Sequence, residues 1–149
     1  MEKIRVNIRR KEGCKDLPLP RYMSEGASGV DLYAAVETEL MLEPQQIRAI
    51  PTGIFVEVPT GYEAQVRARS GLALKNGLAV VNAPGTIDSD YRVEICVILC
   101  NLGKEPFNIQ RGMRIAQLVF QPVVRAELEE TEELQKTKRN EGGFGHTGV

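Results

Sequence analysis

The sequence predicts an all-β domain of the sandwich, jelly-roll or barrel type. Apolar residues recur at every second position in several segments, and turn-forming residues interrupt the chain about every ten residues. Many short strands at this spacing are typical of these architectures. The chain has 149 residues, of which 42% are hydrophobic, so its size and composition suit one ordinary globular domain.

Strands are predicted where apolar and polar residues alternate. This pattern occurs at residues 4–8, 54–58 and, most clearly, 62–68. Two later segments, 93–100 and 115–124, are apolar on both faces over part of their length, which indicates strands buried in a barrel or at a subunit interface. Pro122 marks an edge or a bulge of the second, because proline cannot donate to a strand ladder.

Two helical signals are present. Ser70 is predicted to cap a short helix over residues 71–75, which Asn76-Gly77 would end. A second helical pattern at 127–139 contains a Glu132/Lys136 pair. The family resemblance described below implies instead that this second segment runs extended.

Composition excludes several functional classes. The net charge of −1 and the aromatic content of 5%, without tryptophan, argue against nucleic-acid binding over a broad surface. No apolar run is long enough to span a membrane, and the N-terminus does not resemble a signal peptide, so we expect a cytoplasmic protein. Cys96 and Cys100 would lie about 13 Å apart in a strand, too far for a disulfide. We expect both to be buried small apolar residues.

Known nucleotide and hydrolase motifs are largely missing from the sequence. It contains neither a P-loop nor a Gly-x-Gly-x-x-Gly turn after a strand, and no cysteine and histidine set has zinc spacing. The single histidine, His146, lies in the C-terminal tail, which argues against a Ser-His-Asp triad. The catalytic groups that remain after these exclusions are carboxylates, arginines, backbone groups and Mg²⁺. These groups suit phosphoryl chemistry.

Two patches in the first half of the chain are candidates for this chemistry. Gly29-Val30-Asp31-Leu32 is either a functional patch or a strand end with an aspartate in a turn. Ala68-Arg69-Ser70-Gly71-Leu72-Ala73 leads from a strand into a helix start. Backbone N–H groups, a hydroxyl and a guanidinium would form an anion site there, but a solvated arginine beside a capping serine explains the same residues.

Three further patches follow. In Asn82–Tyr91, an extended backbone would place Asp88 and Asp90 on one face, although a plain polar hairpin loop has the same composition. Gln117 interrupts the apolar run of Arg114-Ile115-Ala116-Gln117-Leu118, so it is either edge-facing or hydrogen-bonded. The glycine-rich tail at 140–149 is either a frayed terminus or a closing lid, because Arg139, Phe144 and Thr147 are groups that a nucleotide would use.

Taken together and in this order, the five patches resemble the five motifs of the trimeric dUTPase family, from Gly26 to Gly148. The resemblance implies a jelly-roll-like β-barrel that forms a homotrimer, with each active site shared among the three subunits. It implies a barrel domain over residues 1–138 and a flexible arm over 139–149 that closes over the active site. It also implies hydrolysis of dUTP to dUMP and pyrophosphate, which limits uracil in DNA and supplies dUMP for dTMP synthesis.

The resemblance assigns roles to individual residues. Asp88 would be the general base that activates water for attack on the α-phosphorus, and Asp31 would lie near a Mg²⁺ ion that bridges the triphosphate. Phosphate contacts would come from Arg69, Ser70, Gly71 and Gln117, with Arg139 and Thr147 at the γ-phosphate. The uracil and sugar would be recognised by Asn82, Gly85, Thr86, Ile87 and Tyr91, with Phe144 stacked over the base.

The sequence departs from the family pattern at Val93, where glycine is usual, and at Ala68, where proline is common. Two other functions compete with the dUTPase assignment. A dCTP deaminase of the same fold would have Arg-Ser-Ser and Asp-Pro-Gly-Phe where this chain has Arg69-Ser70-Gly71 and Asp88-Ser89-Asp90-Tyr91. The second competing function is that of a non-catalytic nucleotide sensor on the same fold.

Overall fold

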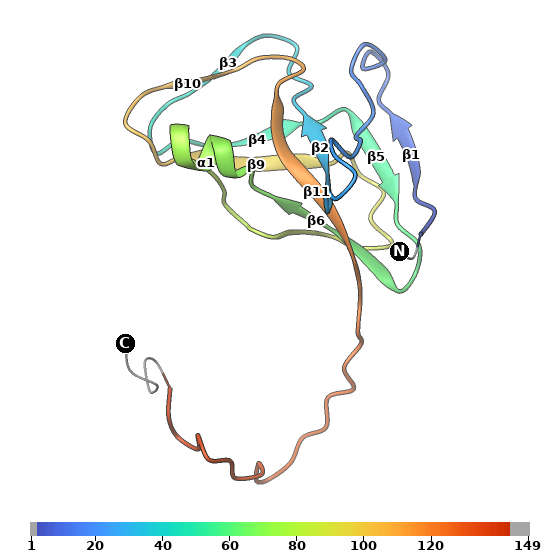
Figure 1. Ribbon diagram of the computed structural model, residues 1–149, viewed down its shortest axis with the longest axis vertical. Coiled ribbons are helices and arrows are strands. Elements are labelled where there is room, and N and C mark those ends of the chain that lie inside the picture. Colours follow the sequence, from blue (N-terminus) through green and yellow to red (C-terminus); the bar gives the residue numbers. More distant parts are fainter. Residues whose placement is uncertain (1–2, 144–149) are drawn as a thin grey trace.

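The structure is a computed structural model that describes residues 3–143, and its regular secondary structure consists almost entirely of short strands (Figure 1). The strands are β1 (Asn7–Arg10), β2 (Gly29–Tyr33), β3 (Leu40–Leu42), β4 (Ile47–Pro51), β5 (Ile54–Glu57), β6 (Tyr62–Arg67), β7 (Leu78–Val80), β8 (Gly85–Ile87), β9 (Cys96–Asn101), β10 (Phe107–Ile109) and β11 (Arg114–Pro122). In the part of the chain that the structure describes, a single short helix, α1 (Ser70–Asn76), lies between β6 and β7. The all-β prediction is confirmed.

The strands pair antiparallel in four small sheets. The largest has the order β2-β11-β6-β8, a second has the order β4-β9-β7, and the pairs β1-β5 and β10-β3 complete the body. The nine-residue strand β11 is central to the largest sheet, because it pairs with β2 along one edge and with β6 along the other. This sheet places three of the sequence patches beside one another.

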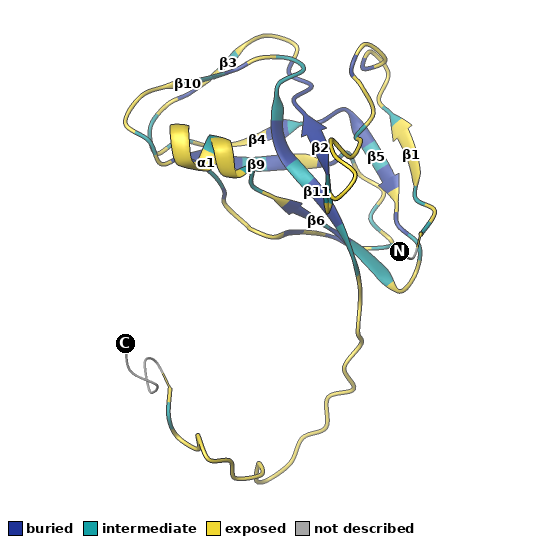
Figure 2. Cartoon of the chain, in the orientation of Figure 1, coloured by how far each residue is buried: buried dark blue, intermediate teal, exposed yellow. Residues whose placement is uncertain are grey.

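The core follows from the alternation in the sequence. Along β6, Ala64 and Val66 are buried while Gln65 and Arg67 reach toward solvent. Other strands bury their inward side chains in the same cluster, and Figure 2 shows these buried segments gathered in the body. The largest fully buried residues include Leu32, Leu42, Ile50, Leu99, Ile115 and Leu118. Burial of such side chains is the main favourable contribution to folding.

The short helix is confirmed, but its predicted cap is wrong. Arg69 occupies the N-cap position in an extended conformation, without a side-chain cap bond, and Ser70 is the first helical residue. Gly77 ends the helix with a φ of 70°, which glycine adopts without strain. The sequence signal at Gly77 was therefore more informative than that at Ser70.

The second predicted helix is wrong, and the extended course implied by the family resemblance is what the structure has. After β11, residues 123–143 contain no helix, and nearly all of them are exposed. Figures 1 and 2 show this segment leaving the body as an extended chain. An isolated helix of this length is marginal without packing against a core, and one charge pair adds little to its stability.

Other expectations are partly corrected. The first strand begins at Asn7 instead of residue 4. Cys100 is buried as expected, but Cys96 is exposed at the start of β9, so the expectation for it was wrong. Within residues 3–143, no helix is long and apolar enough to cross a membrane.

Candidate active site

Asp31 is the centre of a charged cluster on the largest sheet. It lies in the middle of β2 and is 9% exposed. One carboxylate oxygen accepts a hydrogen bond from Arg114 Nη1 at 2.9 Å, and the other lies 3.4 Å from Arg69 Nε. Two guanidinium groups around one carboxylate leave a positive charge in excess, which favours an anion beside them.

Strand order explains why these residues meet. Arg114 begins β11, which pairs with β2, and Arg69 follows β6 on the other side of β11. Arg69 Nη1 also donates to the Arg114 carbonyl at 3.1 Å. Arg114 was not singled out from the sequence, although it lies three residues before Gln117 in a motif that was.

Gln117 lies next to this cluster and is hydrogen-bonded, one of the two alternatives that its sequence left open. Its position on β11 is opposite Asp31 on one side and Arg67 on the other, and its Nε2 donates to the Ala68 carbonyl at 3.0 Å. A Cβ at Gly29 would lie 2.8 Å from Gln117 Oε1, so this glycine allows the close approach.

The start of α1 completes an anion-binding surface. Ser70 and Gly71 directly follow Arg69 and are exposed. A hydroxyl, backbone N–H groups and an arginine are the groups that bind phosphate oxygens. The structure therefore brings Asp31, Arg69, Ser70, Gly71 and Gln117 into one region of one chain.

The Asn82–Tyr91 patch forms a second region. Strand β8 pairs with β6, with Gly85 opposite Val66. A Cβ at Gly85 would lie 3.1 Å from Asn82 Nδ2, so the side chain of Asn82 approaches the backbone of β8 closely. Gly85 and Ile87 are buried, whereas Asn82 and Thr86 are exposed.

Asp88 follows β8 and is exposed. Ser89 and Asp90 form a turn, closed by a bond from Tyr91 N to the Asp88 carbonyl at 3.1 Å. Of the two alternatives that the sequence left open, the structure has the polar loop and not an extended backbone with Asp88 and Asp90 on one face. The half-buried Tyr91 donates from its hydroxyl to the Glu94 carbonyl at 3.2 Å.

Val93 fits the loop in spite of the family's usual glycine. Among residues 3–143, the non-glycine residues with positive φ are Gln45 and Asn140. The backbone at Val93 is therefore one that a β-branched residue can adopt, and its side chain is 63% exposed.

The two regions lie at opposite ends of the same strand. The register of β6 and β8 places Ile87 opposite Ala64, so Asp88 leaves the sheet near Glu63. Arg69 lies beyond the other end of β6, six residues of mostly extended chain and thus roughly 20 Å away. One chain does not bring Asp88 and Arg69 together.

Comparison with known proteins identifies the family. The family model described as dUTPase matches residues 15–148. The chain belongs to the dUTPase family. It is 58% identical over 144 residues to the deoxyuridine 5'-triphosphate nucleotidohydrolase of Thermoanaerobacter sp. (strain X514), and the match covers 97% of each chain.

Solved structures agree with this assignment. The Staphylococcus bacteriophage 80alpha dUTPase with dUPNHPP is similar at a TM-score of 0.88 and 26% identity, over 99% of this chain and 100% of that chain. A mutant dUTPase from phage phi11 of S. aureus, described for its coordination of a structural Mg(II) ion, has a TM-score of 0.78 at 23% identity. That match covers 87% of this chain and 98% of that chain, and it shows the shared fold.

The remaining dUTPase motif lies in the tail. Arg139 is exposed, and its Nε donates to the Gly142 carbonyl at 2.8 Å. Phe144 and Thr147, for which contacts to the base and the γ-phosphate were predicted, lie outside the described residues.

The described residues of this dUTPase offer few side-chain donors for a metal ion. The described part of the chain has no group of three histidine, cysteine, aspartate or glutamate side chains able to hold an ion. Asp31 offers one carboxylate, which the two arginines already contact. This donor set suits Mg²⁺ only where substrate phosphates supply most of the ligands.

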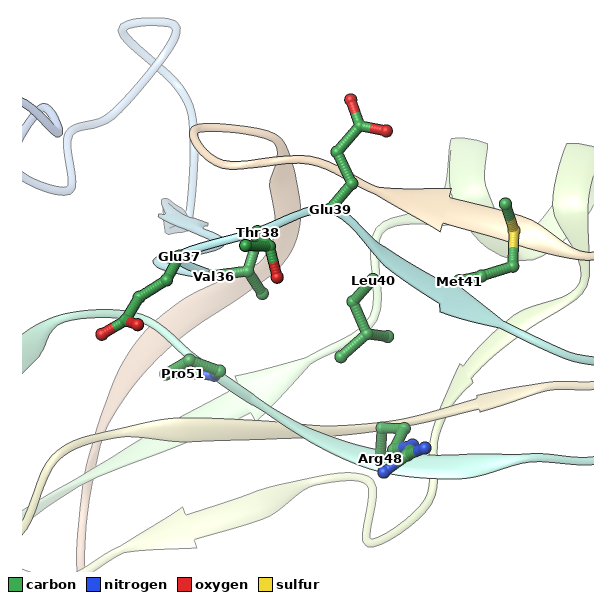
Figure 3. Close-up of a pocket in the computed structure, with 8 residues that line it drawn as sticks. All are labelled: Val36, Glu37, Thr38, Glu39, Leu40, Met41, Arg48 and Pro51. Carbon is green, nitrogen blue, oxygen red and sulfur yellow. The ribbon is translucent and has the colours of Figure 1, made fainter.

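An open pocket between β3 and β4 is separate from these motifs (Figure 3). It is lined by Val36, Glu37, Thr38, Glu39, Leu40, Met41, Arg48 and Pro51. It contains none of the residues predicted for the dUTPase site, and the carboxylates of Glu37 and Glu39 point away from Leu40.

Proposed function

We propose that the protein hydrolyses dUTP to dUMP and pyrophosphate by attack of water on the α-phosphorus. The observation that carries this proposal is the cluster of Asp31, Arg69 and Arg114 beside Ser70 and Gln117, in a member of the dUTPase family. In a cell this reaction would limit uracil in DNA and supply dUMP for dTMP synthesis.

The phosphates would bind at the start of α1. Arg69 is held by Asp31 and by the Arg114 carbonyl, so its guanidinium is fixed before the substrate arrives. Ser70 and the Gly71 backbone are exposed next to it. Fixed donors at developing negative charge stabilise a transition state without reorganisation, which supports a catalytic and not merely a binding role for this region.

The uracil would be recognised in the second region by Asn82 and by the backbone of Gly85, Thr86 and Ile87. Close approach of the base to a backbone strand would leave no room for a thymine methyl group. A cytosine would leave buried polar groups unpaired, which is a strong basis for discrimination. Tyr91 would pack on the deoxyribose and exclude a 2′-hydroxyl.

Asp88 would act as the general base. Its carboxylate is exposed on the turn that leads to Tyr91, where it can reach a water molecule held against the nucleotide. Arg139, Phe144 and Thr147 of the arm over 139–149 would then cover the base and the γ-phosphate, and this closure would exclude bulk water.

Mg²⁺ would enter with the triphosphate. Asp31 would help to hold the ion beside the triphosphate. When bound, the ion supplies positive charge that neutralises the phosphate oxygens.

We also infer that the active enzyme is a homotrimer with shared sites. This proposal is supported by the separation of Asp88 from Arg69 within one chain, because catalysis needs the base and the phosphate contacts at one nucleotide. The tail supports it as well. Val124, Leu128 and Leu134 are 92%, 93% and 89% exposed, and a second copy could cover these apolar side chains.

Hydrolysis in ¹⁸O-labelled water tests the reaction. Attack on the α-phosphorus is expected to place the label in dUMP and to leave pyrophosphate unlabelled. Label in pyrophosphate, or release of orthophosphate, would contradict the proposal. Ammonia released from dCTP would indicate the deaminase, and nucleotide binding without turnover would indicate the sensor.

A further inference from the structure

We propose that Arg92 is a positioning residue, which holds the loop between β8 and β9 so that Asp88 and Tyr91 face the nucleotide. The inference rests on the proposed function, because it assigns Asp88 to the water and Tyr91 to the sugar. Arg92 itself would contact neither the phosphates nor the uracil.

The geometry is a bridge between two backbone carbonyls. Arg92 Nη1 donates to the Ser89 carbonyl at 2.7 Å and to the Tyr91 carbonyl at 2.9 Å. Ser89 follows Asp88 directly and Tyr91 ends the turn, so one guanidinium nitrogen fixes the peptide groups between the general base, Asp88, and the sugar contact, Tyr91. We call this contact the Arg92 bridge.

The loop needs such a contact because it lies outside the sheet ladders. Residues 88–95 belong to no strand, although they connect β8 to the buried strand β9. The bond from Tyr91 N to the Asp88 carbonyl closes the turn on one side, and the Arg92 bridge ties the carbonyls on the other. A charged donor makes a stronger hydrogen bond to a carbonyl than a neutral donor does.

The far end of the loop is anchored separately. Glu94 accepts hydrogen bonds from Gly53 N at 3.0 Å and from Lys11 Nζ at 2.8 Å, and its carbonyl accepts from the Tyr91 hydroxyl. Loss of Arg92 should therefore loosen the turn without releasing the whole segment from the body.

The ion pair of Arg92 with Glu57 is longer than its two carbonyl bonds. Arg92 Nη2 lies 3.6 Å from Glu57 Oε1, and both side chains are about half exposed, at 52% and 54%. Exposed pairs of this kind stabilise weakly, because solvent screens them. The bridge, not the pair with Glu57, should set the position of the turn.

The expected consequence is a loss of sugar discrimination. A displaced Tyr91 would exclude a 2′-hydroxyl less well, and a displaced Asp88 would slow turnover. Small displacements of catalytic groups can cost about 100-fold in rate. We expect Arg92→Ala to lower the ratio of kcat/KM for dUTP over UTP by about 10-fold or more, which a global loss of folded enzyme would not do.

The experiment compares four variants with the full-length enzyme. Selectivity for dUTP over UTP is measured for each, together with amide hydrogen exchange in residues 85–95. Arg92→Lys should retain most of the selectivity, because an ammonium can donate to both carbonyls. Glu57→Gln should change little. Arg48→Ala removes an exposed arginine of β4, far from this loop in the sequence, and serves as the matched control.

The proposal expects faster exchange in the 85–95 segment, together with reduced selectivity, in Arg92→Ala alone. Unchanged exchange there would overturn it. A drop in activity toward dUTP and UTP by the same factor would also overturn it. If the wild-type enzyme failed to hydrolyse dUTP, the proposed function would fail, and hydrogen exchange would still decide whether Arg92 holds the turn.

Discussion

At the scale of single residues, Asp88 carries the sharpest prediction. Asp88→Asn is expected to lower kcat by about 10²–10⁴-fold, because an amide cannot accept a proton from water. Binding of dUTP should persist, since the phosphate contacts lie elsewhere. Asp90→Asn is the matched control, because it removes a second exposed carboxylate of the same turn. Near-normal turnover of Asp88→Asn in a steady-state assay would show that Asp88 is not the base.

Asp16 carries a prediction about pH. Arg111 donates to both carboxylate oxygens of Asp16 at 2.8 Å and also binds the Gly13 carbonyl. The hydrogen bond from Arg111 lowers the pKa of Asp16 below its ordinary value of 3.8. Because the pKa is lower in the folded state, the ionised Asp16 carboxylate stabilises the fold fully above pH 3.8. This stabilisation disappears as the pH falls through the folded-state pKa of Asp16.

We therefore expect Asp16→Asn to melt below the wild type at neutral pH, and the difference to vanish in strong acid. Melting curves across this range measure it, and Glu12→Gln, an exposed neighbour, is the control. A difference that stayed constant down to strong acid would mean that the carboxylate charge is not responsible.

At the scale of elements, helix α1 depends on a contact between two glycines. None of its residues is fully buried, although Leu72 packs partly against the core, so its ends also help to set its position. Gly77 has a φ of 70°, and a Cβ there would lie 2.6 Å from Gly103 N. Leu102 N donates to the Gly77 carbonyl at 2.9 Å, which ties the end of the helix to the loop after β9.

A pair of variants separates backbone strain from this steric clash. Gly61 has a φ of 88° and open space at its Cβ position, so Gly61→Ala should cost only the strain, about 1–2 kcal/mol. Gly77→Ala should destabilise clearly more, and it should also weaken phosphate binding by moving Ser70. Denaturant unfolding gives both values, and equal losses would rule out the clash as a cause.

The elements also show what the sequence could predict. Strands β5 and β6 follow from alternation over four and six residues. Strands β3, β7, β8 and β10 have three residues each, too few for a period to be recognised. The 127–139 segment had a helical pattern, but all of its residues are exposed within the described range 3–143, and a pattern alone does not reveal that.

The candidate site shows the same limit. Motif residues were selected from the sequence because their types suit phosphate chemistry. The ion pairs of Asp31 were not predicted, because Arg69 and Arg114 approach it only through strand pairing. For Ser89 and Asp90 the sequence allowed both an extended backbone and a polar loop, and their composition alone could not distinguish the two.

At the scale of the whole molecule, shared sites predict complementation between inactive chains. Asp88→Asn and Arg69→Ala should each be inactive alone. If a site takes Asp88 from one subunit and Arg69 from another, mixed trimers made by co-refolding equal amounts should regain about a quarter of the wild-type sites. Activity of the mixture is the measurement. An inactive mixture that sediments as a trimer would show that each site takes Asp88 and Arg69 from the same chain.

The most direct test of the central claim is pyrophosphate release with Mg²⁺ from dUTP, measured beside dCTP, dTTP and UTP. We expect rapid release from dUTP and little from the other three nucleotides. This expectation follows from uracil recognition by the β8 backbone, from Tyr91 packed on the deoxyribose, and from phosphate binding beside Arg69. Comparable release from all four nucleotides, or none from dUTP, would contradict the account.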